Sequence, residues 1–324
     1  MKRLKKKSTT FILRVMDWAF SILAVPCAWL LLKYRYTGSA RLPRTTRTLK
    51  RIGLFPIRNH YYEPLFDDSL LRKPLSEDRP LPAVDLNVVG QIKFLDKLQY
   101  SSELTAMNLA QESDDPKKFC INNGNFQAGD ADFLYQFIRA VKPKRIVEIG
   151  SGHSTRIARL ALLKNLSETG VSAEHICVEP YEMKWLEELK EITVIRKPVE
   201  VCDLDWRTTL SDGDLLFVDS SHMIRPQGDV LTEYLEIFPL LSSGVYIHIH
   251  DIFTPKDYMQ SWVVDLVRFW NEQYLLEALL SNTDRYEIVG ALNYLKHHHY
   301  EALSRACPYL SPEWEPASFY MMVR

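Results

Sequence analysis

The sequence predicts an α/β protein built on a mostly parallel sheet with helices on both faces. From Asp130 onward, short apolar runs typical of buried strands alternate with longer segments in which apolar residues recur at helical spacing. Alternation of this kind pairs the strands into one sheet and places the connecting helices over its two faces. The composition agrees, because 46% hydrophobic and 25% charged residues in a chain of 324 residues are typical of globular proteins.

Each element of the alternating region follows from its own pattern. A helix is expected over residues 131–141, because Phe133, Phe137 and Ile138 share one face. Further helices are expected over residues 154–166, 181–190 and 230–241, and one long helix within residues 258–280. The expected strands cover residues 145–149, 174–178, 193–199, 214–218, 244–250, 286–289 and 319–323.

The residues before this region differ in composition and predict a division of the chain into three parts. Residues 1–33 form a basic, apolar segment. Residues 34–129 form a basic linker and a small helical or irregular cap, with helical spacing of apolar residues after Val88. Residues 130–324 form the expected catalytic domain.

The N-terminal segment is expected to associate with a membrane. Its uninterrupted apolar run covers only residues 18–32 and contains Pro26, whereas a straight bilayer span needs about 20 apolar residues. A cleaved signal peptide, a single span, a helix or helical hairpin lying in the cytoplasmic leaflet, and a buried helix are the alternatives. Lysine and arginine residues flank both ends of the run. Basic flanks favour an anionic membrane surface reached from the cytoplasmic side.

Overall charge and cysteine usage exclude several other classes of protein. The net charge of −1 and the pI of about 6.8 give no indication of nucleic-acid binding. The five cysteines are odd in number and widely separated, and no C-x-x-C pair occurs. Neither a disulfide framework nor a zinc knuckle is therefore predicted, and a reducing cytosolic environment is the simplest interpretation.

A glycine-containing turn joins the first strand to the helix after it. Gly150 and Gly152 allow the backbone to turn and approach a ligand closely. No lysine follows Gly152, which excludes a P-loop, and Thr155 stands where a dinucleotide site needs a small residue. S-adenosylmethionine fits better, with Glu148 near its amino group and Glu179, at the end of the second strand, on its ribose hydroxyls. The expected cofactor-binding residues are Glu148, Gly150, Ser151, Gly152, Ser154 and Glu179.

Most of the chain between residues 53 and 290 resembles a bacterial family of class I S-adenosylmethionine-dependent methyltransferases. The family is related in pattern to the cephalosporin-hydroxylase-like and catechol-type methyltransferases. The stretches that carry the resemblance are residues 53–57, 60–66, 122–130, 146–155, 216–222, 248–253 and 270–276. The resemblance implies a Rossmann-like, seven-stranded methyltransferase sheet whose last strand is antiparallel.

Two acids and two histidines should meet at the edge of the sheet where parallel strands end. Asp219 and His222 follow the fourth strand, and His250 and Asp251 end the fifth. The catalytic candidates are His222, His250 and Asp219, with a histidine as general base on an acceptor hydroxyl. The alternative is a divalent metal held by Asp219, His250 and Asp251, with magnesium or manganese as the expected ion. Catechol-type enzymes have acids at the positions of Asp219 and Asp251, but His250 and Ile252 depart from their pattern.

The expected function is methyl transfer from S-adenosylmethionine to an oxygen of a small molecule, glycan or lipid-linked glycan acceptor at the cytoplasmic face of the membrane. Two alternatives belong to other classes. A metal-dependent oxygenase or hydrolase on the same fold would use the same histidines and acids. A non-catalytic, cofactor-binding scaffold at the membrane would need only the glycine-containing loop.

Overall fold

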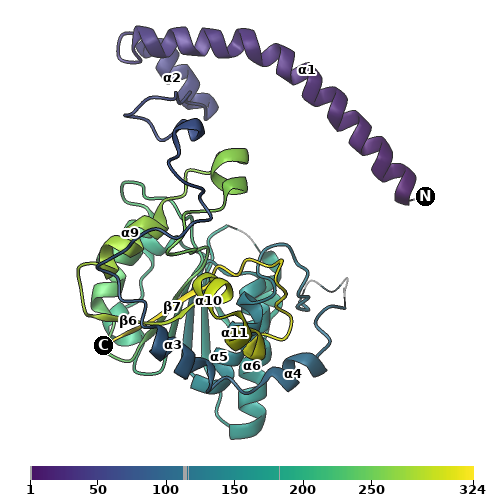
Figure 1. Ribbon diagram of the computed structural model, residues 1–324, viewed down its shortest axis with the longest axis vertical. Helices are drawn as coiled ribbons and strands as arrows, with labels where there is room; N and C mark the ends of the chain where they lie inside the picture. Colours follow the sequence, from purple (N-terminus) through teal and green to yellow (C-terminus); the bar gives the residue numbers. More distant parts are fainter. Residues whose placement is uncertain (1, 112–114, 116, 182) are drawn as a thin grey trace. The chain divides into compact units, whose positions relative to one another are not determined.

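The computed structural model describes residues 2–111, 115, 117–181 and 183–324, and the side chains from residue 11 onward. The chain forms two compact units, residues 1–72 and residues 73–324 (Figure 1). This boundary falls inside the part that the sequence analysis treats as linker and cap. The division into residues 1–33, 34–129 and 130–324 stays a prediction.

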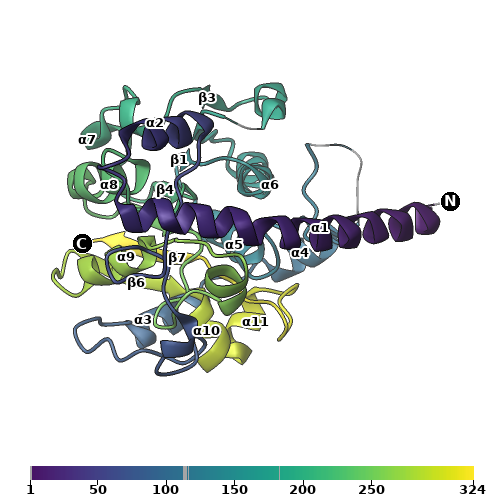
Figure 2. The same ribbon diagram turned by 90° about the horizontal axis from the view of Figure 1, so that it is seen from above.

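The smaller unit begins with one long apolar helix, α1 (Lys2–Thr37), which continues through Pro26 (Figure 2). The helical hairpin considered above is therefore wrong, because the chain makes no turn at Pro26 and loses only the local hydrogen bond that proline cannot donate. Residues Phe11–Thr37 have a mean hydropathy of 1.8, and the apolar part of this helix is not buried. By length and composition, this helix can cross a membrane as an anchor or signal.

The rest of the smaller unit is a short basic helix and a polar cluster. Helix α2 (Pro43–Ile52) has no buried residue and ends at Gly53, whose φ of 86° lies in the left-handed region typical of helix ends. Glu63 accepts hydrogen bonds from Arg35 at 2.6 Å and from Arg58 at 2.7 Å. Desolvation opposes ionisation of Glu63, but Arg58 and Arg35 outweigh it and lower its pKa to about 2.

The described residues of the larger unit form a seven-stranded sheet in the order β3-β2-β1-β4-β5-β7-β6. Strands β1 to β5 pair in parallel, whereas β7 is antiparallel to both of its neighbours. The predicted mostly parallel sheet with an antiparallel last strand is confirmed. The strands are β1 (Arg145–Ile149), β2 (Glu174–Val178), β3 (Thr193–Ile195), β4 (Leu215–Val218), β5 (Tyr246–Ile249), β6 (Tyr286–Ala291) and β7 (Phe319–Val323).

Helices cover both faces of this sheet and bury a separate apolar layer on each (Figure 1). One layer packs Phe217 and Tyr320 of the sheet under the first group of helices, and the other packs Val147 and Leu216 under the second group. The first group comprises α3 (Val88–Leu95), α4 (Ser101–Ala106), α5 (Asp130–Val141), α6 (His153–Thr169), α10 (Leu292–His298) and α11 (Tyr300–Ala306). The second comprises α7 (Trp206–Thr209), α8 (Asp229–Thr232) with the π and 3-10 turns Glu233–Ile237 and Phe238–Leu240, and α9 (Glu272–Leu280).

Two of the expected helices are not formed as predicted. Of residues 181–190, the described part contains only a 3-10 turn, Lys184–Glu188, which follows Met183 at a φ of 54°; residue 182 of that prediction lies outside the described residues. The long helix expected within residues 258–280 is divided into a π turn, Ser261–Asp265, and α9. Val267 lies between them at a φ of 53°, a conformation that cannot continue a right-handed helix.

Candidate active site

The strand ends bring the predicted site residues to one edge of the sheet, around a cavity of about 580 Å³. The loop after β1, Glu179 after β2, Asp219 after β4 and His250 after β5 all contribute to its wall. Sequence-predicted residues that line it are Gly150, Ser151, Gly152, Ser154, Glu179, Asp219, His222, His250 and Asp251. Among the residues predicted for cofactor, catalysis or metal, Glu148 does not line it.

Gly150 is required by the closeness of two strands. Its φ is 80°, and a Cβ at this position would lie 1.9 Å from the backbone oxygen of Asp219. The amide of Asp219 donates to the carbonyl of Ile149 at 2.8 Å, so this close approach is fixed by the sheet itself. Gly152 differs, because its φ of −178° is extended and a Cβ would meet only Met183 at 3.7 Å. Of the two glycines, only Gly150 combines a positive φ with a clash against backbone.

Glu179 ties the loop to the end of β2. Its carboxylate accepts from the amide of Ser151 at 3.2 Å and from the amide of Tyr181 at 3.0 Å. A second cavity of about 370 Å³ shares Gly150, Ser151, Glu179 and Asp219 with the first. The loop and Glu179 therefore lie where two cavities meet, which suits an elongated ligand with two chemically different ends.

Glu148 lies behind the loop and does not line the cavity. Its side chain is fully buried, and one carboxylate oxygen is 2.9 Å from Nε2 of His175 and 3.5 Å from Sγ of Cys177. Because side chains alternate along a strand, Glu148 points into the face of the sheet that packs against α6 rather than toward the cavity. In this position it can support the turn of the loop from below, as predicted, and its predicted place near a ligand's amino group stays a prediction.

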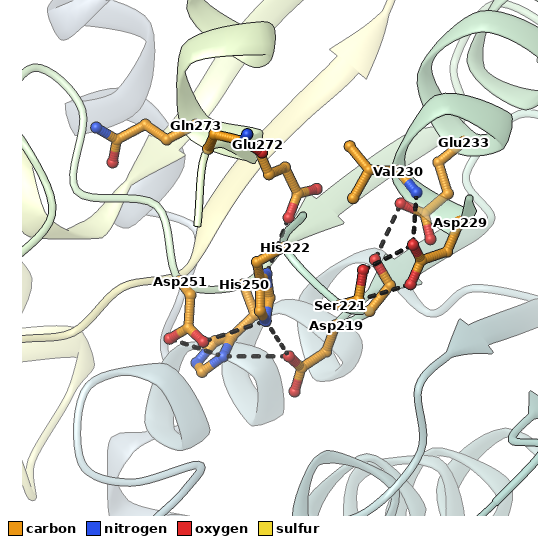
Figure 3. Close-up of polar contacts among 12 residues, drawn as sticks. Asp219, Ser221, His222, Asp229, Val230, Glu233, His250, Asp251, Glu272 and Gln273 are labelled. Atoms are coloured by element: carbon orange, nitrogen blue, oxygen red, sulfur yellow. Dashed lines mark hydrogen bonds and ion pairs between the residues drawn. The ribbon is translucent and has the colours of Figure 1, made fainter. Parts of the chain in front are cut away.

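Asp219, His222, His250 and Asp251 form the rim of the site at this edge of the sheet (Figure 3). His222 is its most tightly held side chain. Its Nδ1 is 2.9 Å from a carboxylate oxygen of Glu272, and its Nε2 is 3.3 Å from both Asp219 and Asp251. Glu272 fixes the orientation of the ring, which leaves Nε2 directed toward the cavity residues. The sequence analysis assigned no role to Glu272, although it lies in the matching stretch 270–276 as an acid in the first turn of a helix.

His250 is held more loosely among three acids. Its Nδ1 is 3.4 Å from Asp251 and 3.7 Å from Asp219, and its Nε2 is 3.6 Å from Asp130. Asp130 accepts from the amides of Ala317 and Ser318 and is thereby fixed at the start of α5. Asp130 was not predicted as a site residue, and its place at the start of a helix before β1 gave no indication of contact with β5.

The acids govern the protonation of both imidazoles. Burial alone would lower the pKa of His222, but hydrogen bonds to Asp219 and Glu272 outweigh it and raise that pKa well above its usual value. For His250, burial is likewise outweighed by the charges of Asp251 and Asp219, which raise its pKa. The rim therefore stabilises an imidazolium at each position.

The donor set of the rim fits a divalent cation. One ligand atom from each of Asp219, His222 and Asp251 lies within 4.8 Å of the others. Around them, Nε2 of His250 and one oxygen of Glu272 are buried without a hydrogen-bond partner among the described residues. Two carboxylates and one imidazole favour manganese, iron or zinc over magnesium. The sequence predicted His250 as the third ligand beside Asp219 and Asp251. In the structure, the histidine that is grouped with these two acids is His222.

Comparisons with known proteins agree with this geometry. Residues 147–252 match a protein family described as a methyltransferase domain. An uncharacterized protein of Archaeoglobus fulgidus is 28% identical over 170 residues, which cover 49% of this chain and 75% of that protein. An O-methyltransferase from Bacillus cereus, solved with SAH, is 13% identical at a TM-score of 0.35 and covers 72% of this chain and 91% of its own. A putative methyltransferase from Thermobifida fusca YX is 11% identical at a TM-score of 0.39. The match covers 73% of this chain and 94% of that protein.

The sheet order, the loop after β1 and the matched residues together define a class I S-adenosylmethionine-dependent methyltransferase. Both TM-scores are below 0.5, so this assignment depends on the family match and on the chain's own geometry. More particularly, residues 147–252 are a methyltransferase domain, and they contain β1 to β5 with the loop, Glu179 and the histidines of the rim.

The two glycines of the loop give a matched test of this geometry. Gly150→Ala should lower stability by roughly 2–4 kcal/mol, because it adds both a positive-φ penalty and a clash with the Asp219 carbonyl. Gly152→Ala should leave the thermal midpoint of the larger unit within a few degrees of the parent. Thermal unfolding of both variants checks this, and equal midpoints would contradict the backbone contact described here.

Proposed function

We propose that this enzyme transfers a methyl group to a hydroxyl oxygen of a glycan, glycolipid or other small molecule at the cytoplasmic face of the membrane. The observation that carries the proposal is the position of His222. Its ring is oriented by Glu272 and directs Nε2 toward the cavity. One wall of this cavity is the loop of residues 150–152 after β1, called the cofactor loop below. A base in this place can deprotonate an acceptor that lies beside the cofactor.

The residues present fit S-adenosylmethionine. Backbone amides after β1, at the N-terminus of α6, together with Glu179 provide donors and a carboxylate around the junction of the two cavities. The residues that would hold the cofactor are Gly150, Ser151, Gly152, Ser154 and Glu179. When bound, S-adenosylmethionine supplies an electrophilic methyl group, and the sulfur retains the electron pair of the broken carbon–sulfur bond.

The first form of the mechanism uses the chain's own residues as base. His222, in its neutral form, takes the acceptor's proton at Nε2, while Glu272 holds Nδ1 and prevents the ring from turning. Because the acids raise the pKa of His222, the neutral form that this step needs becomes more populated as the pH rises. Asp219 and Asp251 then stabilise the imidazolium that results, since the contacts that raise the pKa of His222 also favour its protonated form. His250 lies beside the same acids and can support their orientation.

The second form includes a divalent cation held by Asp219, His222 and Asp251. When bound there, a cation would act as a Lewis acid that lowers the pKa of the acceptor hydroxyl. His222 cannot use Nε2 both as a ligand and as a base, so His250 would then be the group that receives the proton. Two carboxylates and an imidazole that converge beside the cavity favour cation binding over a purely structural role for Asp219 and Asp251.

Membrane association is proposed from the smaller unit alone. Helix α1 presents an exposed apolar surface over the length of a bilayer core. Helix α2 has Arg44, Arg47, Lys50 and Arg51 in ten residues and no acid. Each basic side chain near an anionic surface contributes about 1 kcal/mol of attraction, which favours the cytoplasmic leaflet.

The cofactor assignment is tested by calorimetric titration of S-adenosylhomocysteine into the full chain in neutral detergent. The parent should bind with a micromolar Kd, and Glu179→Ala should bind at least tenfold more weakly, a loss of about 1.4 kcal/mol or more. Glu174→Ala removes an exposed acid at the start of the same strand and should bind as the parent does. A folded protein without affinity would instead favour the metal-dependent oxygenase or hydrolase.

The cation is tested by adding manganese(II) to the full chain and following free manganese by electron paramagnetic resonance. Asp251→Asn should weaken binding at least tenfold, because it removes one of three ligands. Asp203→Asn changes an exposed acid that does not line the cavity, and this variant should bind like the parent. If the parent does not bind manganese, zinc or iron(II), the base mechanism of His222 is the one that remains.

The anchor is tested by comparing the full chain with a chain that starts at Leu42. The full chain should sediment with membranes after high-salt washing and be released by neutral detergent. The shorter chain should be recovered in the soluble fraction, because it lacks the apolar surface of α1. A shorter chain that stays on the membrane after washing would show that α1 is not the anchor.

A further inference from the structure

The segment between β5 and α9 contributes a stacked cation to the wall of the cavity. Trp262 and Trp270 meet edge to face with ring centroids 5.0 Å apart. The guanidinium of Arg268 lies over both rings, 4.8 Å from the centroid of Trp262 and 4.4 Å from that of Trp270. All three side chains line the cavity that contains His222. Stacking of this kind holds the plane of a guanidinium while leaving its edges free to donate hydrogen bonds.

Arg268 differs from the arginines of the larger unit whose charge is paired or whose guanidinium has a hydrogen-bond partner in the protein. Arg79, Arg139 and Arg159 each form an ion pair with a glutamate. Arg156 and Arg285 form no ion pair, but Arg156 is 3.1 Å from Nδ1 of His153 and Arg285 donates to the carbonyl of Leu241. Within the part of the chain that the structure describes, no carboxylate lies within ion-pairing distance of Arg268. Its backbone amide donates to the carbonyl of Trp262, but its side chain has no polar partner there. A fixed guanidinium in a cavity wall without a counterion is a receptor for an anion.

A strained turn in the backbone before Arg268 places its side chain beside the two tryptophans. Val267 has a φ of 53°, which is strained for a β-branched residue. The hydrogen bond from the Arg268 amide to Trp262, at 2.9 Å, closes the turn over this residue. Without this turn, the chain would continue as a helix, and Arg268 would lie on the side away from the face that Trp262 and Trp270 share. The strained turn therefore holds Trp262, Arg268 and Trp270 together as one stacked group.

The stacked group is also connected to the proposed base. Trp270 contacts the ring of His222, with centroids 4.4 Å apart. One tryptophan therefore separates the guanidinium from the imidazole. Asp219 and Asp251 make the area around His222 acidic and would repel an anion. The cavity thus has an acidic end with a base and a cationic end with hydrogen-bond donors.

We infer that the acceptor carries an oxyanion, a phosphate or a carboxylate, which Arg268 binds while the acceptor's hydroxyl lies at His222. The inference rests on the proposed function and narrows its acceptor class to anionic hydroxyl compounds. Arginine suits either oxyanion, because two parallel N–H groups match two oxygens of the anion. Such binding at one end of the acceptor orients the hydroxyl at the other end.

The test uses the full chain in neutral detergent, saturated with S-adenosylhomocysteine, and three probes that share a phenyl group. Phenyl phosphate, benzoate and uncharged benzyl alcohol are titrated by calorimetry. One of the two anions should bind at least tenfold more tightly than benzyl alcohol, and which one binds identifies the group. Arg268→Met should abolish this preference, and Arg268→Lys should retain part of it, because lysine keeps the charge without the planar pair of donors.

Arg207→Met is the matched control, because it removes the same charge from an exposed position outside the cavity, and it should leave the preference unchanged. Equal anion binding by the parent and by folded Arg268→Met would overturn the inference, as would a parent that binds neither anion. The titration is repeated without S-adenosylhomocysteine. Anion binding that depends on Arg268 in a protein without affinity for S-adenosylhomocysteine would refute the proposed function and keep the anion site.

Discussion

The backbone of Gly150 lies against the carbonyl oxygen of Asp219, and the site depends on this contact. Strands β1 and β4 are paired up to Ile149 and Val218, and the amide of Asp219 continues the ladder by donating to Ile149. The cofactor loop must therefore leave β1 directly beside the residue that begins the rim. A side chain at position 150 would clash with the backbone of Asp219, so either that residue or the loop would have to move. In the proposed enzyme, cofactor binding and catalysis would share one backbone constraint, which would keep the methyl donor and the proposed base adjacent.

Burying two imidazoles at this edge requires acids from outside the parallel strands. Each imidazole lies between the acids at the strand ends and one acid from a helix. Glu272 lies in the first turn of α9, and Asp130 lies in the first turn of α5. Both acids are nearly excluded from water and lie where the N-terminus of a helix interacts favourably with a carboxylate. The rim is therefore assembled from strand ends that supply Asp219, His222, His250 and Asp251 and from helix starts that supply the acids beside the two histidines.

The sequence was sufficient for features that depend on local pattern. Strands β1, β2 and β7 have the predicted bounds, because each is an apolar run with a clear break at its end. Acids and histidines at strand ends could be predicted to converge, since parallel strands end at one edge. The direction of Glu148 could not be predicted from its spacing to Gly150 alone, because the two residues belong to a strand and to a turn. Partners such as Glu272 depend on where a helix begins in space, about fifty positions along the chain from His222.

The region within residues 258–280 shows why the acceptor side of the site was the hardest to predict. Its aromatic residues have the spacing of one continuous helix, on which Trp262 and Trp270 would form part of a core-facing stripe. Strain at Val267 breaks that helix and returns Trp270 to Trp262, so both rings pack against Arg268 and only part of each is buried. A periodic pattern assigns faces only while the helix continues. The proposed recognition of the acceptor would therefore depend on a local departure from periodicity, whereas the proposed cofactor site depends on the regular sheet, and the two can vary independently in a fold of this kind.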